Sequence, residues 1–401
     1  MSPHASGSLM RWASAFSAHS ESVAAAREVA ALVAGELNGA QADLVIAFFD
    51  SAHLDNVADL MQALRETLNP GCLVGVSAHG VISSQHEVET SPALSLIAAS
   101  VPGVEVRPFV MVNSTWVAAL EDAEEFARCT PGLDGAELVM LFADPFTFDI
   151  ERCLGAINRH APGLRVVGGM ASAGVRPGAN TIVLNDWVAH EGGIGIALKG
   201  ALRVDVVVSQ GCRPVGPPLE VTRVEGNLVL ELDGEPAVDR AEAVLRKLPQ
   251  AEQALLRNGL YVGRPARAGA IGQGDYLIRN LLGADRNRGA LAVADVMTAQ
   301  EHIRLHVRDA GTAAEDLELL LAPQEFDSRA AAALLFACNG RGRGLFGQAD
   351  CDIGTLQSAL GGSIPVAGMF CAGEIGPVGE RNLLHGHTAS IAIVRPKAIP
   401  S

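Results

Sequence analysis

One short segment of the chain carries a thiol and two guanidinium groups, and it offers the clearest chemistry in the sequence. The segment from Cys338 to Gly344 joins an apolar run to a glycine-rich loop that contains Asn339, Arg341 and Arg343. Guanidinium groups bind carboxylates and phosphates through paired hydrogen bonds, and a nearby arginine would lower the pKa of the thiol. The alternatives are a solvated basic loop beside a buried, inert cysteine, and covalent catalysis by that cysteine.

A second polar cluster follows, formed by Cys371, Glu374, His385 and His387. On a strand the two histidines would share one face, so both could line a pocket in which Glu374 orients them. Structural hydrogen bonding and a zinc site are the alternatives, since cysteine and histidine are zinc ligands. No zinc-knuckle spacing is present, and we predict no metal and no cofactor.

The hexapeptide Gly75-Val-Ser-Ala-His-Gly80 presents Ser77 and His79 after an apolar strand. Its backbone amides could form a concave anion site, although it lacks the spacing of phosphate-binding loops. The alternative is a tight turn in which the glycines adopt positive φ angles. The segment also differs from the nucleophile elbow of serine hydrolases, because its second glycine comes one residue late and a strand follows it. We predict no catalytic residue.

Two further pairs of polar residues stand at predicted strand ends. Arg279 and Asn280 lie in a β-patterned stretch, where surface ion pairs are the default and a buried arginine would indicate a ligand site. Asp50 and Asp144 follow equivalent apolar runs, and helix capping explains them better than a catalytic carboxylate pair does. The residues predicted to bind a ligand are Ser77, His79, Arg279, Asn280, Cys338, Asn339, Arg341, Arg343, Cys371, Glu374, His385 and His387.

Most of these residues belong to a motif that occurs three times along the chain. Each copy opens with an apolar run, continues with a one-sided helical pattern, and returns through a second strand into a glycine-framed loop. The three apolar runs are Leu44–Phe48, Leu138–Phe142 and Ala333–Phe336. Gly75 and Gly169 are 94 positions apart, the same offset that separates the first two runs.

Each copy closes with another apolar strand, so the repeating unit is strand, helix, strand, strand. Between the second and third copies lies a β-rich stretch with one helix near Val238 to Leu256 and linker candidates at Arg213 to Pro218 and Gly259 to Gly274. We predict a mixed α/β (α+β) fold, a layered sandwich with mixed sheets and outer helices. The two domains would span residues 13–203 and 204–397.

The composition argues against several classes of protein. A net charge of -15, from 45 acidic and 30 basic residues, disfavours nucleic acid as a partner. The seven cysteines never form a CxxC pair, which favours reduced thiols over a disulfide framework. Neither a signal peptide nor an apolar run of about 18 residues is visible, so we predict a cytoplasmic protein without a membrane span.

Four stretches, read together, resemble the FIST family, in which a FIST N-terminal domain precedes a FIST C-terminal domain. The resemblance covers nearly the whole chain, about Leu44 to Val394, and implies an intracellular signalling module that binds small ligands such as amino acids. In eukaryotes the module resembles the substrate-side part of an F-box protein. The four stretches are Gly75–Gly80, Asp275–Asn280, Leu334–Gly342 and Met369–Pro377, the last with its follow-on Leu384–Ala389.

From the residues and the resemblance we predict a stand-alone sensory or signalling FIST protein. Its ligand, an amino acid or another small anion, would occupy a polar pocket between the two halves. One alternative is a thiol-dependent enzyme that uses Cys338 or Cys371 with His385 or His387 as the base. The other is an adaptor for a protein partner. We expect a binding protein rather than an enzyme.

Overall fold

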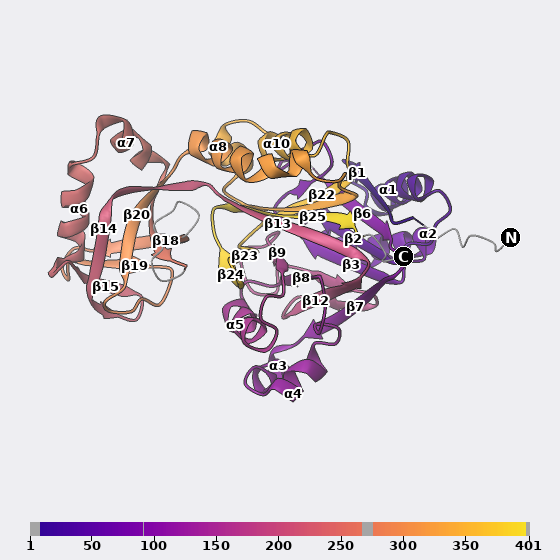
Figure 1. The fold of residues 1–401 in the computed structure, drawn as a ribbon, viewed down its shortest axis with the longest axis horizontal. Helices are drawn as coiled ribbons and strands as arrows, with labels where there is room; N and C mark the ends of the chain where they lie inside the picture. Colours follow the sequence, from indigo (N-terminus) through magenta and orange to yellow (C-terminus); the bar gives the residue numbers. More distant parts are fainter. Residues whose placement is uncertain (1–8, 91, 267–275, 398–401) are drawn as a thin grey trace. The chain divides into compact units, whose positions relative to one another are not determined.

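The chain forms two compact units in the computed structural model, which describes residues 9–90, 92–266 and 276–397 (Figure 1). Within these residues, unit 1 runs to 208, resumes from 318 to 384 and continues from 389, whereas unit 2 takes 209–317 and 385–388. Unit 2 is therefore an insertion in the last third of unit 1. The two units are interleaved along the chain, so they do not correspond to two consecutive domains. The domain boundary expected near residue 203 stays a prediction.

Unit 1 contains three copies of one pattern of strands and helices, although residues 310–317 of the third copy belong to unit 2. Copy 1 comprises β1 (Arg11–Ser17), α1 (Ser22–Leu37), β2 (Leu44–Phe49), α2 (Val57–Leu68), β3 (Cys72–Ser77), β4 (Val81–Ile82), β5 (Glu87–Val88) and β6 (Leu94–Ser100). Copy 2 comprises β7 (Val104–Met111), α3 (Asn113–Ala119), α4 (Ala123–Cys129), β8 (Leu138–Ala143), α5 (Ile150–His160), β9 (Val166–Met170), β10 (Ile182–Leu184), β11 (Trp187–Ala189) and β12 (Gly193–Gly200). Copy 3 comprises β13 (Leu202–Gln210), α8 (Ala310–Leu321), β21 (Ala332–Cys338), α9 (Gly342–Phe346), α10 (Cys351–Ala359), β22 (Val366–Cys371), β23 (Glu374–Val378), β24 (Arg381–His385) and β25 (Thr388–Pro396).

Each copy builds a six-stranded mixed sheet around a central parallel pair, which is β2–β3, β8–β9 or β21–β22. A hairpin from another copy completes each sheet. Copy 2 supplies β10 and β11 to the first sheet, copy 3 supplies β23 and β24 to the second, and copy 1 supplies β4 and β5 to the third. The predicted mixed α/β fold of repeated units is confirmed, and the copies additionally exchange hairpins in a closed cycle.

The inner faces of the three sheets share one hydrophobic core. Phe48, Phe142 and Phe336 occupy equivalent positions on the three first strands, and all are fully buried. Their ring centroids lie 5.7–6.0 Å apart in edge-to-face contacts, which is the favoured aromatic geometry. These three rings mark the centre of the pseudo-threefold arrangement.

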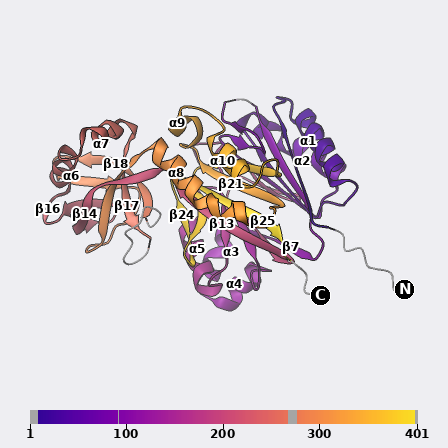
Figure 2. The ribbon, with the colours of Figure 1, turned by 45° about the horizontal axis from the view of Figure 1, so that its top comes forward.

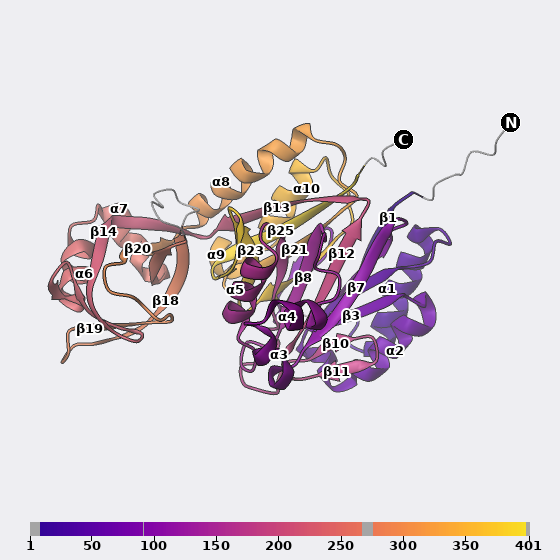
Figure 3. The same ribbon diagram turned by 60° about the horizontal axis from the view of Figure 1, so that its bottom comes forward.

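The helices of copies 1 and 2 lie on the outer faces of their sheets. Helices α1 and α2 pack side by side on the first sheet through Val29, Val33, Leu60 and Leu64, whose spacing of four residues keeps each pair on one face (Figures 2 and 3). Leu154 of α5 contributes in the same way to the core outside the second sheet. In the described part of the chain, no helix has the length and apolar character that a membrane span requires.

The strand register corrects the predicted equivalence of Gly75 and Gly169. Gly75, Gly168 and Gly368 pair with equivalent residues of the three first strands. A Cβ atom added at Gly168 or Gly368 would lie 2.0 or 1.8 Å from a carbonyl oxygen of the neighbouring strand. The expected positive φ angles at Gly75 and Gly80 are wrong, since neither residue adopts one. At Gly80 the constraint is contact, because an added Cβ would lie 2.5 Å from a carbonyl oxygen of β5.

The described residues of unit 2 form an antiparallel sheet with two helices of its own, and residues 310–317 of α8 also belong to this unit. Its strands follow the order β14-β20-β17-β18-β19-β15-β16, and a pairing of β14 with β15 closes the sheet on itself. The apolar core lies between these strands and α6. The elements are β14 (Cys212–Glu225), β15 (Leu228–Leu232), β16 (Glu235–Pro236), α6 (Ala237–Arg246), α7 (Gln250–Leu255), β17 (Leu260–Pro265), β18 (Tyr276–Asp285), β19 (Ala290–Val293) and β20 (His302–Arg308).

Two linker predictions and one helix prediction in unit 2 need correction. Arg213 to Pro218 is part of β14, because Val215 faces the apolar core and anchors the segment despite its prolines. The predicted linker Gly259 to Gly274 contains the whole of β17, and residues 267–274 lie outside the described residues. The single predicted helix is two helices, divided at Pro249, which precedes α7. Proline is favoured at a helix start, because the N–H group that it lacks would have no partner within the helix there.

Candidate functional site

The three glycine-framed loops interlock at one end of unit 1. The amide of Ser172 donates to the carbonyl oxygen of Ser77 at 3.1 Å. The amide of Ala372 donates to the carbonyl oxygen of Met170, the last residue of β9, also at 3.1 Å. The third link runs through a hydroxyl group. His79 N donates to Ser172 Oγ at 2.8 Å, and Ser172 Oγ donates to the carbonyl oxygen of Phe370 at 2.6 Å. A ring of hydrogen bonds therefore joins the three copies.

The backbone amides of the first loop that were considered as an anion site donate to partners within the chain. The amides of Ser77 and Ala78 donate to the carbonyl oxygens of Thr181 and Phe49 at 2.9 and 2.8 Å. The amide of His79 donates to the serine hydroxyl of the ring. Ser77 Oγ is buried and accepts from Thr181 N, while the imidazole of His79 is exposed. Through these contacts the loop of copy 1 is held against copy 2 of unit 1.

The guanidinium group of Arg341 is engaged within the chain. Arg341 and Asp352 form an ion pair through two hydrogen bonds, of which Nη2–Oδ1 measures 3.0 Å, and both side chains are 1% exposed. Arg341 N also donates to the carbonyl oxygen of Cys338 at 2.7 Å. Arg343 is exposed, and its amide donates to a carboxylate oxygen of Glu89 at 2.8 Å. The fork of Arg341 thus binds an internal carboxylate.

Cys338 and Cys371 are direct partners on the parallel strands β21 and β22. Cys338 is half-buried, and Asn339 N donates to the carbonyl oxygen of Cys371 at 2.9 Å. The thiol of Cys371 is completely buried, and burial raises its pKa well above the usual value, with further increases from Glu374 and Cys338. A catalytic thiol needs the opposite shift, toward the thiolate.

Iodoacetamide at pH 7.5 is expected to modify Cys371 at least about 100-fold more slowly than Cys338, because a buried neutral thiol is neither nucleophilic nor accessible. Peptide mass spectrometry over a time course measures both rates. In urea the two cysteines should react at similar rates, which serves as the control. Rapid modification of Cys371 in the folded protein would contradict the expectation and favour thiol chemistry.

A groove of about 640 Å³ lies in unit 1 where elements of copies 1 and 3 meet. It is bounded by β1, the end of α1, the turn between β4 and β5, helix α10 and the loop before β22. None of the twelve predicted ligand residues lines it. The sequence carried no signal for this groove, because hairpin exchange brings its walls together. Its polar lining residues include Ser14, Glu36, Ser83, His86, Asp350 and Gln357.

Asp350 joins the exchanged hairpin to copy 3 at the wall of the groove. Its Oδ1 accepts from the amide of Glu87 at 2.6 Å, and its Oδ2 lies 3.4 Å from Nδ1 of His86. Gln357 Nε2 donates to the carbonyl oxygen of Ser84 at 2.7 Å, which fixes the turn from the side of α10. The polar wall is therefore held in place by contacts between two copies.

Glu87 lies behind this wall with its side chain 4% exposed. Its Oε1 accepts from the amide of Ile353 at 2.9 Å. Burial, and then the charge of Asp352, raise the pKa of Glu87 to about 7. Near neutral pH this carboxyl group is consequently divided between its protonated and ionised forms.

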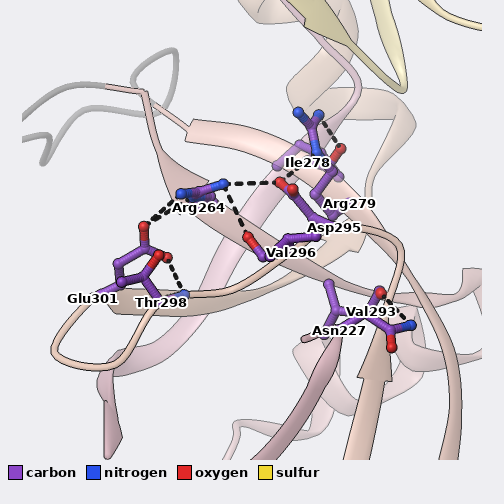
Figure 4. A network of polar contacts seen from close by, with 9 residues as sticks. All are labelled: Asn227, Arg264, Ile278, Arg279, Val293, Asp295, Val296, Thr298 and Glu301. Carbon is purple, nitrogen blue, oxygen red and sulfur yellow. Dashed lines mark hydrogen bonds and ion pairs between the residues drawn. The ribbon is translucent and has the colours of Figure 1, made fainter. Parts of the chain in front are cut away.

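In unit 2, strand alternation separates Arg279 from Asn280. Arg279 Nε donates to Asp295 Oδ2 at 2.9 Å, and both side chains are about 10% exposed or less (Figure 4). Arg264 Nη1 lies 3.2 Å from the same oxygen, Asp295 Oδ2. Arg264 Nη2 lies 2.6 Å from Glu301 Oε1. Arg279 therefore belongs to a largely buried network on one side of β18, opposite the side that carries Asn280.

Asn280 meets His387 instead. Asn280 Oδ1 lies 3.0 Å from His387 Nε2, and the ring of Tyr261 is 4.3 Å from the imidazole. Burial, and then the charge of Arg308, lower the pKa of His387 to about 4. The expectation that His385 and His387 share a strand face is wrong, because β24 ends at His385 and His387 adopts a φ of 62° in the following turn.

The predicted cluster divides between the two units, with Cys371 and Glu374 in unit 1 and His385 and His387 in unit 2. Glu374 and His385 are both buried. Among the residues that the structure describes, no three histidine, cysteine or acidic side chains are arranged to hold a metal ion.

The two repeated aspartates differ in role. Asp50 accepts from Ala52 N at 3.2 Å and caps the 3₁₀-helix of residues Ser51–Asn56, as expected. Asp144 does not cap α5, since Asp149 does. It is buried and accepts from Thr147 Oγ1 at 2.8 Å and from the side-chain amide of Asn180 at 2.9 Å.

Comparison with known proteins identifies the class of this chain. The family model of the FIST N domain matches residues 43–235, and that of the FIST C domain matches residues 237–377. The chain belongs to the FIST family, which confirms the resemblance seen in the sequence.

Its relatives include proteins of similar length without assigned functions. An uncharacterized protein of Mycobacterium bovis is 39% identical over 373 residues, which cover 92% of this chain and 95% of the relative. An uncharacterized protein of Mycobacterium tuberculosis is 38% identical over the same shares. Among solved structures, a cyanuric acid hydrolase from A. caulinodans aligns over 97% of this chain and 100% of its own, with a TM-score of 0.32 and 9% identity. At these values the likeness carries no inference about chemistry.

Proposed function

We propose that this protein binds a small molecule in the groove between copies 1 and 3 of unit 1, as a sensory FIST protein of the cytoplasm. The observation that carries the proposal is the groove itself. Its volume of about 640 Å³ falls within the usual range for small-molecule sites, about 300–1,000 Å³. The association of FIST domains with small-ligand sensing in signalling supports it.

The lining favours a ligand that carries an amino group. Glu36 and Asp350 contribute carboxylates, and the described residues that line the groove include no lysine or arginine. An anion would meet these carboxylates without a compensating cation, whereas an ammonium group would gain charge-assisted hydrogen bonds. Of the two predicted ligand classes, the groove thus favours an amino acid, whose ammonium group offsets its own carboxylate, over a simple organic anion.

The binding proposal is tested by closing the groove with Gly354→Leu. Gly354 lies on α10 at the groove, and an added Cβ there meets no atom within 4 Å. Leucine should therefore fill space without a clash, and it favours the helix by roughly 0.8 kcal/mol. We expect the variant to lose at least about tenfold in affinity for the ligand that native mass spectrometry finds on protein purified from cells, as measured by isothermal titration.

The matched control is Gly155→Leu on α5, where an added Cβ is equally free of contacts. This variant should bind as the wild type does. Equal affinity in wild type and Gly354→Leu, or protein that carries no ligand and binds none of the twenty amino acids, would remove the groove as the ligand site.

A further inference from the structure

One face of the sheet in unit 2 carries polar and aromatic side chains beside a small apolar cluster of Cys212, Tyr276 and Ile278. Tyr261 of β17 is paired with His306 of β20 on one side and with Asn280 of β18 on the other. Residues directly opposite in antiparallel strands share a face, so these three side chains form one layer. The neighbouring residues Val262 and Leu305 point to the other face and join the core beneath α6.

Ring contacts extend this layer on both sides. The imidazole of His306 lies 5.1 Å from the ring of Tyr276, and the carbonyl oxygen of Tyr276 accepts from the side-chain amide of Gln210. The imidazole of His387 lies 4.3 Å from the ring of Tyr261. We call the set of Gln210, Tyr261, Tyr276, Asn280, His306 and His387 the histidine layer.

Hydrogen bonds define the tautomer of both imidazoles. His306 Nδ1 lies 3.0 Å from the carbonyl oxygen of Arg304, which can only accept, so Nδ1 carries the proton and Nε2 a lone pair. His387 Nε2 faces the Oδ1 acceptor of Asn280, so its Nδ1 carries the lone pair. Burial lowers the pKa of each histidine to about 4, which keeps both rings neutral at pH 7.

Three buried acceptors of this layer have no hydrogen-bond partner in the described part of the chain. They are Nε2 of His306, Nδ1 of His387 and Oε1 of Gln210. His306 and Gln210 are at most 2% exposed. Buried polar atoms are almost always paired in folded proteins, so three orphaned acceptors in one layer call for a molecule that supplies donors.

We propose that the histidine layer is a second binding site, which takes a neutral, planar small molecule with several N–H donors. The tyrosine rings favour a flat ligand, and the neutral acceptors of the two imidazoles and the amide offer no charge to an ion. Asn280 is exposed, and Tyr261 and His387 are half-buried, so the layer opens to solvent on that side. The site is independent of the groove in unit 1.

Phenylurea, which has three N–H bonds, is the probe, and 1,1-dimethyl-3-phenylurea, which keeps one, is its matched control. Isothermal titration of the whole protein should show at least about tenfold weaker binding of the dimethyl compound. His306→Phe keeps a ring but removes the acceptor, and loss of one hydrogen bond should weaken phenylurea binding by about tenfold. His302→Phe, the same change at an exposed position of β20, should leave the affinity unchanged.

Gln210→Leu provides a second test of the acceptors and decides the outcome if circular dichroism shows that His306→Phe does not fold. It should also weaken phenylurea binding, whereas Gly354→Leu in the groove should have no effect. No binding of phenylurea by the wild type, equal binding of the two ureas, or full affinity in the folded acceptor variants would each overturn the second site. None of these outcomes bears on the groove.

Discussion

Truncation of Phe142 to alanine is expected to lower the free energy of unfolding of unit 1 by about 3–5 kcal/mol. The ring is fully buried and contacts Phe48 and Phe336 at centroid distances of 5.8 and 5.7 Å, so its removal opens a cavity where all three sheets meet. The equivalent truncations of Phe48 and Phe336 should cost similar amounts. Urea titration followed by far-UV circular dichroism measures the loss.

Phe326→Ala is the matched control, because Phe326 is 90% exposed and its truncation should change the stability by less than about 0.5 kcal/mol. The double variant of Phe48 and Phe142 should lose less than the sum of the single losses, since the two rings share one cavity. A loss below about 1 kcal/mol at any of the three positions would show that the sheets do not share a tightly packed centre.

Acidification should destabilise unit 2 between pH 6.5 and pH 4. The pKa of His306 is lowered from 6.5 to about 4 in the folded chain, so below pH 6.5 the unfolded state binds a proton that the folded state rejects. Stability is fully present above pH 6.5 and is lost as the pH falls. Between pH 7 and pH 5 the expected loss is about 2 kcal/mol from His306, and His387 adds to it in the same direction.

Glu87 lies in unit 1 and gives the unfolding of the whole chain the opposite slope, because its pKa is raised from 4.5 to about 7 and its contribution is lost as the pH rises through that range. The measurement is therefore best made in a Glu87→Gln background, where glutamine still accepts from Ile353 N. Urea midpoints at pH 7, 6 and 5 should fall steadily, and they should fall less when His306→Phe is added. The same slope with and without His306 would contradict the assignment.

The repeating strands of unit 1 were predictable because each is a short apolar run between turn residues, and burial on both faces requires that pattern. That Arg279 and Asn280 lie on opposite faces of the sheet was also predictable, since adjacent strand residues point to opposite faces. By contrast, the ion pair of Arg341 with Asp352 was not, because Arg341 lies in the loop before α9 and no sequence pattern pairs it with a residue of α10. Nor was the groove, because its lining residues from copy 1 and those from copy 3 are more than 250 residues apart along the chain.

The exchange of hairpins also determines the order in which the three sheets can be completed during synthesis on the ribosome. The second sheet needs β23 and β24, which are among the last strands to be synthesised, although its other strands are complete before residue 201. The third sheet needs β4 and β5, which emerge near the start and must wait for β22. Until then each nascent copy exposes an unpaired sheet edge, which is an aggregation hazard. Co-translational folding of unit 1 therefore ends only after β24 has left the exit tunnel.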